Sequence, residues 1–439
     1  MNAIEQRRKL DFSRELAEKG WYHSFELPDG TLIHGAMELE HQRGRFARFP
    51  IPEDLGGKRV LDIGAWDGWF SFEAERRGAQ VTAVDCVEVA NFLTIHRKLA
   101  SKVDYRILDL YEMPQAELGR FDIVFFLGVL YHVKHPLLAL EIVCALTSDV
   151  AIVESFVTDG DTWQDHREEI PMMEFYETDE LGNQLDNWIG PRVGCLLAMC
   201  RAAGFARVEL LQVSESNATV ACYRRWEPPP QGPLEAAPDL VSVMNSRTLG
   251  HNFSTRKDEY IACWLRISRK AVTRQQLRLE VDGLGVPALH VRRDIGDSWL
   301  ANFRVPPGLE KGWKTLRLRF DNSGFSRALR IAIDLPVYAS EIVLKGVYDG
   351  STWEPGRVRA GERAFVSCWV KGLPENCDRA NVRVYMGETR LVVEWIGEPD
   401  SEGFRQVNAW VAGDFAKGEC AFRVECAGVN SEPVTLIVI

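Results

Sequence analysis

The sequence predicts an α/β Rossmann-like domain of seven strands, followed by two tandem all-β immunoglobulin-like sandwiches. Strand-like and helix-like patterns alternate before the proline-rich segment EPPPQGP at 227–233, whereas only strand patterns follow it. Alternation implies crossover connections and a mainly parallel sheet with helices on both faces. Three consecutive prolines cannot continue a helix or a central strand, so we expect a linker over 229–236.

Local patterns predict each element of the first domain, which we assign to residues 1–228. Apolar runs predict strands over 59–64, 80–85, 103–109, 121–128, 150–155, 206–213 and 218–225. Helical spacing predicts helices over 4–19, 69–78, 88–100, 135–147 and 191–204. The Asp29-Gly30 pair predicts the turn of a hairpin, which places a helix and a hairpin within 1–50. The long segment 156–190 is expected to form a lid-like insert.

An internal repeat predicts the two sandwiches, over 237–335 and 336–439. The blocks DEYIACWLRI and ERAFVSCWVKG align so that Cys263 and Cys368 lie 105 positions apart, and several other strand patterns recur close to this offset. Each copy holds alternating strands separated by turn residues over the length of one sandwich. We expect the two Cys-Trp pairs to be core residues. We expect the sandwiches to act in recognition or assembly, including homo-oligomer formation.

Composition restricts the partners. The chain of 439 residues carries a formal net charge of −11, and an acidic chain does not attract phosphate backbones by its overall field. We therefore expect a small-molecule partner rather than nucleic acid. None of the ten cysteines forms a Cys-x-x-Cys pair, and we expect no metal. No stretch approaches the ~20 apolar residues of a membrane span, and the N-terminal segment is highly charged, so we expect a cytoplasmic protein.

A candidate ligand-binding site lies in the segment VLDIGAWDGWFSFEAERRGAQVTAVD, residues 60–85. An apolar strand runs into Asp62, Gly64, Ala65 and Gly68, and a second strand ends at Asp85. Glycines permit close backbone approach to a ligand, and an acid after the second strand is placed to accept hydrogen bonds from ribose hydroxyls. A pyrophosphate site would require Gly-x-Gly-x-x-Gly instead. The acidic first position suits a ligand that carries an ammonium and a sulfonium.

This pattern resembles the class I S-adenosylmethionine-dependent methyltransferases. The resemblance implies that the loop at 62–68 holds the amino-acid part of S-adenosylmethionine and that Asp85 holds the ribose. It also implies that Asp109 or Leu110, after the third strand, meets the adenine. Gly128, the last residue of the fourth predicted strand, is assigned to the same cofactor site.

A closer resemblance begins at Gly128, where the motif Gly-Val-Leu-Tyr-His is similar to the tRNA wobble-uridine carboxymethyltransferase branch. That branch implies a carboxylated donor, held by a lysine before the first strand, an arginine near the last strand and the motif tyrosine, Tyr131 here. Segments 21–35 and 214–220 contain no lysine or arginine, and we expect Arg224 and Arg225, which lie beyond, to face solvent. An unpaired carboxylate in a closed site is costly, so we expect ordinary S-adenosylmethionine.

Three residues are candidates for catalysis. His132 and Tyr131 follow the fourth strand, at the edge where open α/β sheets bind ligands, and Glu154 ends the fifth. His132 is the first candidate for a general base, although it equally suits a helix cap, and Glu154 equally suits a buried charge partner. The insert offers possible pocket walls, namely Trp163, His166, Tyr176 and Trp188.

We therefore expect methyl transfer from S-adenosylmethionine to a small molecule, such as a sugar or a natural-product hydroxyl. One alternative is a tRNA uridine (carboxy)methyltransferase. A second alternative is a non-catalytic binding or assembly protein that retains the cofactor fold.

Overall fold

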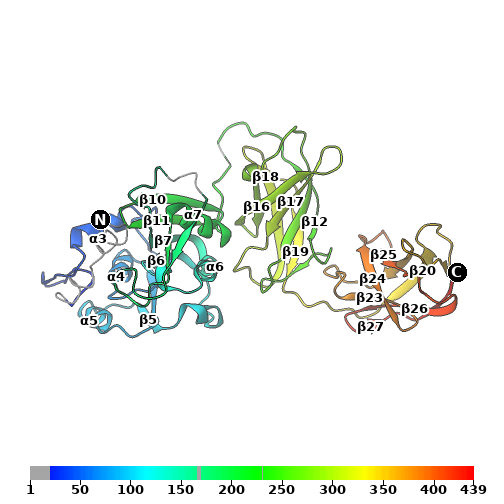
Figure 1. The fold of residues 1–439 in the computed structure, drawn as a ribbon, viewed down its shortest axis with the longest axis horizontal. Coiled ribbons are helices and arrows are strands. Elements are labelled where there is room, and N and C mark those ends of the chain that lie inside the picture. Colours follow the sequence, from blue (N-terminus) through cyan, green and yellow to red (C-terminus); the bar gives the residue numbers. More distant parts are fainter. Residues whose placement is uncertain (1–19, 166–169, 230) are drawn as a thin grey trace. The chain divides into compact units, whose positions relative to one another are not determined.

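The computed structural model describes residues 20–165, 170–229 and 231–439, which form two compact units (Figure 1). The first unit comprises residues 1–228 together with 306–308, and the second comprises 229–305 and 309–439. The expected helix over 4–19 lies outside the described residues. The finer domain boundaries given above stay a prediction.

The first unit is built on a seven-stranded sheet with the order β10-β11-β7-β6-β3-β4-β5. Strands β3 to β7 are parallel, and β11 is antiparallel to both of its neighbours. The strands are β3 Arg59–Ile63, β4 Gln80–Asp85, β5 Asp104–Ile107, β6 Phe121–Leu127, β7 Thr147–Phe156, β10 Arg207–Val213 and β11 Asn217–Tyr223. The strand order reverses between β3 and β6, and ligands bind at such a point, outside the carboxyl ends of the strands.

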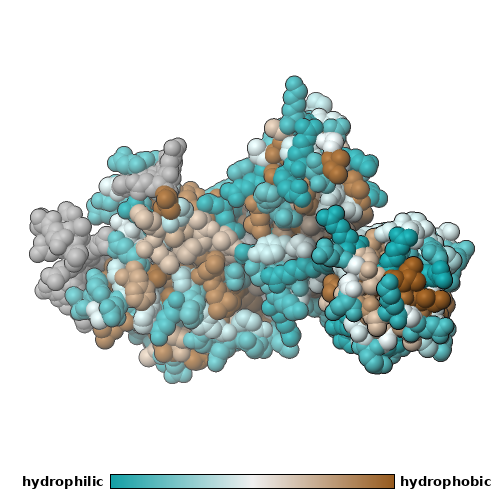
Figure 2. All heavy atoms as spheres, turned by 45° about the vertical axis from the view of Figure 1, so that its right-hand side comes forward, coloured by the Kyte–Doolittle hydropathy of each residue, from teal (hydrophilic) through white to brown (hydrophobic). Residues whose placement is uncertain are grey.

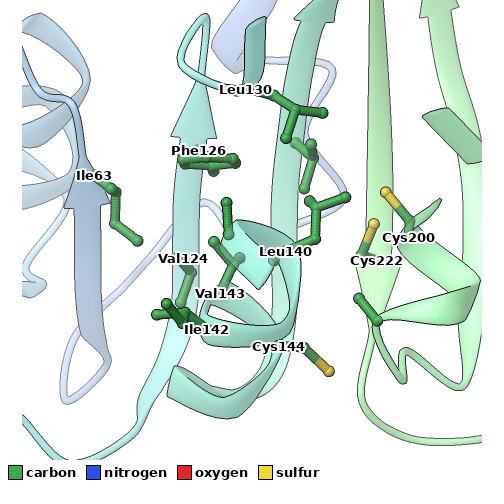
Figure 3. Close-up of a cluster of buried hydrophobic side chains, with 14 of the residues drawn as sticks. Ile63, Val124, Phe126, Leu130, Leu140, Ile142, Val143, Cys144, Cys200 and Cys222 are labelled. Carbon is green, nitrogen blue, oxygen red and sulfur yellow. The ribbon is translucent and has the colours of Figure 1, made fainter. Parts of the chain in front are cut away.

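Helices cover both faces of this sheet, as predicted. One apolar core joins the sheet to α3, α4 and α5, and the other joins it to α6 and α7. Figure 3 shows the second core, where Val124 and Phe126 of β6 lie near Leu140 and Val143 of α6. The helices are α3 Leu39–Phe46, α4 Trp69–Arg76, α5 Ala90–Lys98, η2 Leu110–Gln115, η3 Leu130–His132, α6 Pro136–Leu146 and α7 Val193–Ala202.

Two parts of the first unit lie outside the sheet. The hairpin of β1 (Phe25–Glu26) and β2 (Leu32–Ile33) turns at Gly30 as predicted, and Gly30 has a φ of 82°. Helix α3 follows the hairpin and was not predicted from the sequence. Within the insert, β8 (Met173–Phe175) and β9 (Ile189–Pro191) form a short antiparallel pair.

The second unit contains two sandwiches of the same topology, which confirms the immunoglobulin-like prediction. The first has the strand order β12-β14-β17-β16-β15-β18-β19-β13, and the second has β20-β22-β25-β24-β23-β26-β28-β21. Each path divides into two packed sheets of four strands around one apolar core. In Figure 2, hydrophilic residues dominate the visible surface and apolar residues gather in small patches.

The strands of the first sandwich are β12 Asp239–Asn245, β13 Asn252–Phe253, β14 Tyr260–Arg266, β15 Leu277–Val281, β16 Leu284–Arg293, β17 Ser298–Arg304, β18 Gly312–Phe320 and β19 Leu329–Ile333, with η4 at Arg274–Gln276. Those of the second are β20 Val343–Asp349, β21 Arg357–Val358, β22 Phe365–Lys371, β23 Val382–Met386, β24 Thr389–Ile396, β25 Phe404–Trp410, β26 Gly418–Cys426, β27 Val429–Asn430 and β28 Val434–Val438.

The repeated Cys-Trp pairs correct one expectation. Cys263 and Cys368 are fully buried in the two cores, but Trp264 and Trp369 are only partly buried. Successive side chains of a strand point to opposite faces of the sheet, so both members of a pair cannot enter the core. The cysteines are core residues, and the tryptophans lie on the outer faces.

Arg224 corrects a second expectation, because it is fully buried rather than exposed to solvent. Its guanidinium donates to the carbonyl oxygen of Pro307 at 2.6 Å and to that of Gly204 at 3.3 Å. Residues 306–308 belong to the first unit by their contacts, although they connect β17 and β18. Arg225, in contrast, is exposed as expected.

The packing of residues 306–308 yields a stability prediction. Gly308 has a φ of 77°, and a Cβ there would lie 2.4 Å from the carbonyl oxygen of Ala145, whereas Gly283 has a φ of 81° and open space around it. Both Gly→Ala changes strain the backbone, but only Gly308→Ala adds a clash, which should cost the first unit a further ~1–3 kcal/mol. Calorimetric unfolding of the full chain tests this, and equal effects of the two substitutions would contradict it.

Candidate active site

The loop between β3 and α4 requires glycine at two positions. Gly64 has a φ of 73° and Gly68 a φ of 89°. A Cβ at Gly64 would lie 2.4 Å from Cγ2 of Val129, and a Cβ at Gly68 would lie 2.6 Å from the ring of Phe92. Side chains therefore cannot occupy these positions, and the loop backbone lies closely packed at the carboxyl end of β3. This is the place where the strand order reverses.

Asp85 anchors this loop to the end of β4. Its Oδ2 atom accepts a hydrogen bond of 3.0 Å from the backbone N–H of Trp66, and the residue is 7% exposed. The N–H groups of Gly64 and Ala65 bond the carbonyl oxygen of Val84. Asp85 thus holds the loop with one oxygen, and its contact with a ribose hydroxyl stays a prediction.

Asp62, at the end of β3, is a buried acid. Its carboxylate accepts a hydrogen bond of 2.6 Å from the hydroxyl of Ser71 on α4. Burial raises the pKa of Asp62 to about 6, although the Ser71 hydrogen bond and the nearby His23 oppose the shift. A buried carboxylate without a full counter-charge gains most from a cationic ligand. The residue therefore suits the ammonium group that the sequence analysis assigned to it.

Asp67 is a site residue that the sequence analysis missed. It is fully buried, and its carboxylate accepts from the backbone N–H groups of Tyr22 and His23, at 3.0 and 2.9 Å, and from Nδ1 of His23. These contacts hold the segment before the first hairpin against the glycine loop. The acid lies inside the loop pattern Asp-x-Gly-x-x-Asp-Gly, which was the only available signal.

Asp109 and Leu110 differ in their availability to an adenine. Asp109 is exposed and caps η2, where its Oδ1 atom accepts from the backbone N–H of Tyr111 at 2.8 Å. The Leu110 side chain is buried in the core on the α6 side. The backbone N–H of Leu108 bonds the carbonyl oxygen of Asp85, which ties the two strand ends together. The adenine contact stays a prediction, and Asp109 is the better placed of the two.

The Gly-Val-Leu-Tyr-His motif lies at the carboxyl end of β6. Gly128 has a φ of 73°, and its N–H bonds the carbonyl oxygen of Glu154 at 3.0 Å. Burial raises the pKa of the Tyr131 phenol well above its ordinary value, so this hydroxyl stays protonated. His132 is 31% exposed, and its Nδ1 atom lies 3.3 Å from the backbone oxygen of Asp186 and 3.5 Å from its carboxylate. Burial lowers the pKa of His132, so the imidazole is neutral at pH 7.

Arg45 is the second site residue that the sequence analysis missed. It projects from α3, and its Nη2 atom lies 2.6 Å from Oε1 of Glu154, with side chains only 10% and 14% exposed. The other carboxylate oxygen of Glu154 accepts from the hydroxyl of Thr219 at 2.9 Å. Both charges influence the buried phenol of Tyr131. The expectation that this region lacks a cation was therefore incomplete, because α3 was not predicted.

The predicted pocket walls of the insert divide into two groups. Tyr176 packs against Phe156 and Tyr131, and the backbone N–H of Trp188 bonds the carbonyl oxygen of Tyr131 at 2.8 Å. Trp163 instead belongs to the core on the α6 side. His166 lies outside the described residues. The insert thus contacts the Gly-Val-Leu-Tyr-His motif through Tyr176 and Trp188.

The described residues contain neither a metal-binding cluster nor a membrane-spanning helix. No group of three or more His, Cys, Asp or Glu side chains is arranged to hold a metal ion, over 20–165, 170–229 and 231–439. In the same ranges, no helix is long and apolar enough to cross a membrane. Eight of the ten cysteines are buried, while Cys86 is exposed and Cys420 is partly exposed.

Comparison with known proteins agrees with the sheet order and the loop. Residues 38–193 match a family described as a methyltransferase domain. The matched region contains the glycine loop, Asp85 and the Gly-Val-Leu-Tyr-His motif. The first unit is therefore a class I methyltransferase domain, the class that takes S-adenosylmethionine as its methyl donor.

The chain is also similar to several bacterial enzymes named tRNA U34 carboxymethyltransferase. The one from Pseudomonas syringae pv. syringae (strain B728a) is 31% identical over 179 residues, which are 39% of this chain and 53% of the relative. The one from Pseudomonas paraeruginosa (strain DSM 24068 / PA7) is 32% identical over 189 residues, which are 42% and 55% of the two chains. The chain thus spans about half the length of the curated relatives that it matches.

Solved structures show more distant similarity. The N-terminal domain of EvdMO1, crystallised in the presence of SAH and D-fucose, is 21% identical with a TM-score of 0.36, covering 49% of this chain and 96% of that one. The [4+2]-cyclase SpnF is 15% identical with a TM-score of 0.35, covering 51% and 96%.

The geometry at Asp85 predicts its effect on donor binding. S-adenosylmethionine should bind the purified chain, and Asp85→Ala should weaken binding by roughly tenfold to hundredfold, or about 1–3 kcal/mol, because a buried acceptor of ligand hydroxyls is lost. Titration calorimetry measures this. Asp104→Ala, which removes an exposed acid from the start of β5, is the control and should leave the affinity unchanged. Absence of binding by the wild type would contradict the assignment of this site.

The raised pKa of Asp62 predicts opposite effects on stability and on binding. A carboxyl group with a native pKa near 6 stabilises the fold below its unfolded pKa, and this contribution is lost as the pH rises through about 6. Asp62→Asn should therefore stabilise the free protein at pH 8, by on the order of 1–3 kcal/mol. Donor affinity of the wild type should fall as the pH drops below about 6, while the variant binds weakly at every pH. A pH-independent wild-type affinity between pH 5 and 7 would refute the role of Asp62.

Proposed function

We propose that the chain transfers the methyl group of S-adenosylmethionine to a hydroxyl of a small molecule, such as a sugar or a natural product. The observation that carries this proposal is the geometry of His132. A neutral imidazole at the carboxyl end of β6, with Nδ1 directed at Asp186, presents Nε2 as a proton acceptor. A hydroxyl acceptor must lose its proton during transfer, and this arrangement supplies the base that such a reaction needs.

In this proposal, residues at different places in the site have different roles in methyl transfer. When bound, S-adenosylmethionine supplies a methyl group already activated on a sulfonium. Asp62, Asp85 and the glycine loop orient the donor. His132 takes the acceptor proton at Nε2, and the protonated Tyr131 donates a hydrogen bond within the site. The insert excludes water through Tyr176 and Trp188, since alignment and exclusion of water provide much of the rate for a displacement of this kind.

Glu154 is less suited to act as the base. One of its oxygens is paired with Arg45 and the other accepts from Thr219. Because a guanidinium and a hydroxyl engage both oxygens, the carboxylate has no free oxygen to receive a proton from the acceptor. We propose instead that Glu154 fixes Arg45, and that the pair forms one wall of the acceptor pocket.

The alternative function, carboxymethyl transfer to tRNA, is favoured by the names of the relatives and by Tyr131. A carboxylated donor needs a cation that is free to bind its carboxylate. Arg45 is already neutralised by Glu154 at 2.6 Å, and breaking a largely buried ion pair is costly. The pairing therefore supports the ordinary donor and, with the net charge of −11, a small-molecule acceptor.

Donor selectivity tests this choice. In a competition assay, the carboxylated donor should bind the wild type no better than S-adenosylmethionine. Glu154→Gln removes the charge that occupies Arg45, so it should shift the ratio of affinities toward the carboxylated donor by about tenfold, the value of one charge-assisted hydrogen bond. Thr219→Val leaves the ion pair intact and should not change the ratio. A wild type that prefers the carboxylated donor would establish the alternative function.

The pH dependence of turnover tests the role of His132. Its pKa lies below the ordinary 6.5, so kcat/KM should rise with pH, level off below neutrality and remain constant above it. His132→Ala should lower turnover by ~10²–10⁴ and abolish this rise, with donor affinity little changed. His135→Ala, at an exposed position three residues further on, is the control. Full turnover in the His132 variant would leave the reaction to positioning alone.

A further inference from the structure

The outer face of one sheet in the second sandwich carries an unusual set of side chains. Strands β20, β22, β25 and β24 lie side by side in this sheet. Directly opposed residues in an antiparallel sheet share a face, and Trp369 lies opposite Gln406, while Phe365 lies opposite Trp410. Alternate residues of β22 and β25 are buried in the core. The aromatic and amide side chains therefore face outward together.

Aromatic rings are exposed on this face and at its rim. Trp353, Trp395 and Trp410 are 51%, 41% and 38% exposed. The rings of Trp353 and Tyr348 lie 5.7 and 5.4 Å from that of Trp369. Large aromatic side chains are strongly favoured in cores and interfaces. Three exposed tryptophans on one small domain therefore indicate a ligand-binding or partner-binding surface.

Polar groups occupy the middle of the same face. Oδ1 of Asn408 accepts from the hydroxyl of Ser367 at 2.8 Å and from Nε2 of Gln406 at 3.0 Å. Asn408 lies opposite both Ser367 and Trp395. Among the described residues, Nδ2 of Asn408 and Oε1 of Gln406 have no hydrogen-bond partner, so one donor and one acceptor remain for a ligand. We name this set, Trp353, Trp369, Trp395, Gln406, Asn408 and Trp410, the aromatic platform.

A basic cleft adjoins the platform. A cavity of about 540 Å³ is lined by residues that include Arg247, Arg379, Arg390 and Val392. Val392 is 65% exposed and lies opposite Trp410, so the cleft and the platform are continuous along β24. Arg379 contacts the backbone oxygen of Arg247 and lies 3.7 Å from Glu394. The guanidinium groups of Arg247 and Arg390 have no acidic partner among the described residues.

The first sandwich shows that the fold itself does not require several of these residues. The bulge that places Trp395 in β24 recurs in β16, where the corresponding residue is His290. The position of Trp410 is held by Arg304, and that of Gln406 by Leu300. The first copy keeps two of the platform positions, as Trp264 and Asn302, but the residues at the positions of Trp395, Gln406 and Trp410 differ between the copies. This difference is expected of a binding surface and not of a structural requirement.

We propose that the aromatic platform and the basic cleft bind an acidic carbohydrate. The flat tryptophan rings suit the apolar C–H faces of sugar rings, and the free amide groups of Asn408 and Gln406 suit their hydroxyls. The unpaired guanidinium groups of Arg247 and Arg390 bind a carboxylate or phosphate substituent of the sugar. In a chain of net charge −11, two adjacent arginines without an acidic partner among the described residues, Arg247 and Arg390, are complementary to an anionic ligand. This site is separate from the methyl-transfer site, so it does not depend on the proposed function.

Binding of defined oligosaccharides to the full chain tests the proposal. The probes are a hexamer of galacturonic acid, its phosphate-bearing counterpart built on mannose 6-phosphate, and a neutral glucose hexamer of equal length. Titration calorimetry should show that at least one acidic hexamer binds at least tenfold more tightly than the neutral one. Trp410→Ala should weaken this binding about tenfold, since stacking on the ring is lost, and Arg390→Gln should remove the preference for the acidic probe.

Controls separate binding from folding. His290→Ala changes the first-sandwich counterpart of Trp395, and Tyr338→Ala removes an aromatic side chain that is 78% exposed elsewhere in the second unit. Both should leave affinity unchanged. Arg390→Gln alters an exposed side chain and should not lower the unfolding temperature. The proposal is overturned if no hexamer binds, if binding persists in both Trp410→Ala and Arg390→Gln, or if a tRNA mixture binds the platform more tightly than the acidic hexamers. None of these outcomes bears on methyl transfer.

Discussion

The close packing of backbone at the carboxyl end of β3 is the constraint on which the candidate active site depends. Val129 fills the space that a side chain at position 64 would need, and the ring of Phe92 does the same at position 68. The loop can therefore adopt its path only with glycine, and it then presents backbone to the ligand. Asp85 and Asp67 hold this path from two sides, with hydrogen bonds to residues distant in the sequence. The shape of the candidate donor site is therefore a consequence of how tightly the strands and helices pack around this loop.

The Arg45–Glu154 pair shows how charge is distributed around the rest of the site. A helix that follows the N-terminal hairpin brings a guanidinium to the end of β7, and Thr219 on the antiparallel strand β11 completes the contacts of the carboxylate. Three separate elements thus meet at one acid. Because Glu154, Arg45 and Thr219 contact one another, His132 is the group at this edge that we propose as the general base. The nearby phenol of Tyr131 is kept protonated by its burial.

In the two sandwiches, the residues that form the fold are shared, whereas the residues on the outer face differ. Both copies keep the strand order, the buried cysteines and the bulge, which lies in β16 and in β24. Core positions are restricted by packing, because a change of side-chain volume there destabilises the whole sandwich. Outward positions are not restricted in this way, and the two copies have diverged there. Only the second has tryptophans at the positions of Trp395 and Trp410, where the first has His290 and Arg304.

The sequence by itself determined the fold class of both units, because hydrophobic periodicity, glycine spacing and an internal repeat are local or pairwise signals. It also indicated Asp62, Gly64, Gly68 and Asp85 as one site, since the carboxyl ends of parallel strands meet at one edge. The short polar helix α3 escaped prediction because its pattern is weakly amphipathic, and with it Arg45 was missed. Arg224 was misplaced because its acceptor at Pro307 lies 83 positions away. Which charges are paired, and which hydroxyls and imidazoles remain available, was decided only by the tertiary structure, because those contacts join elements that no local pattern connects.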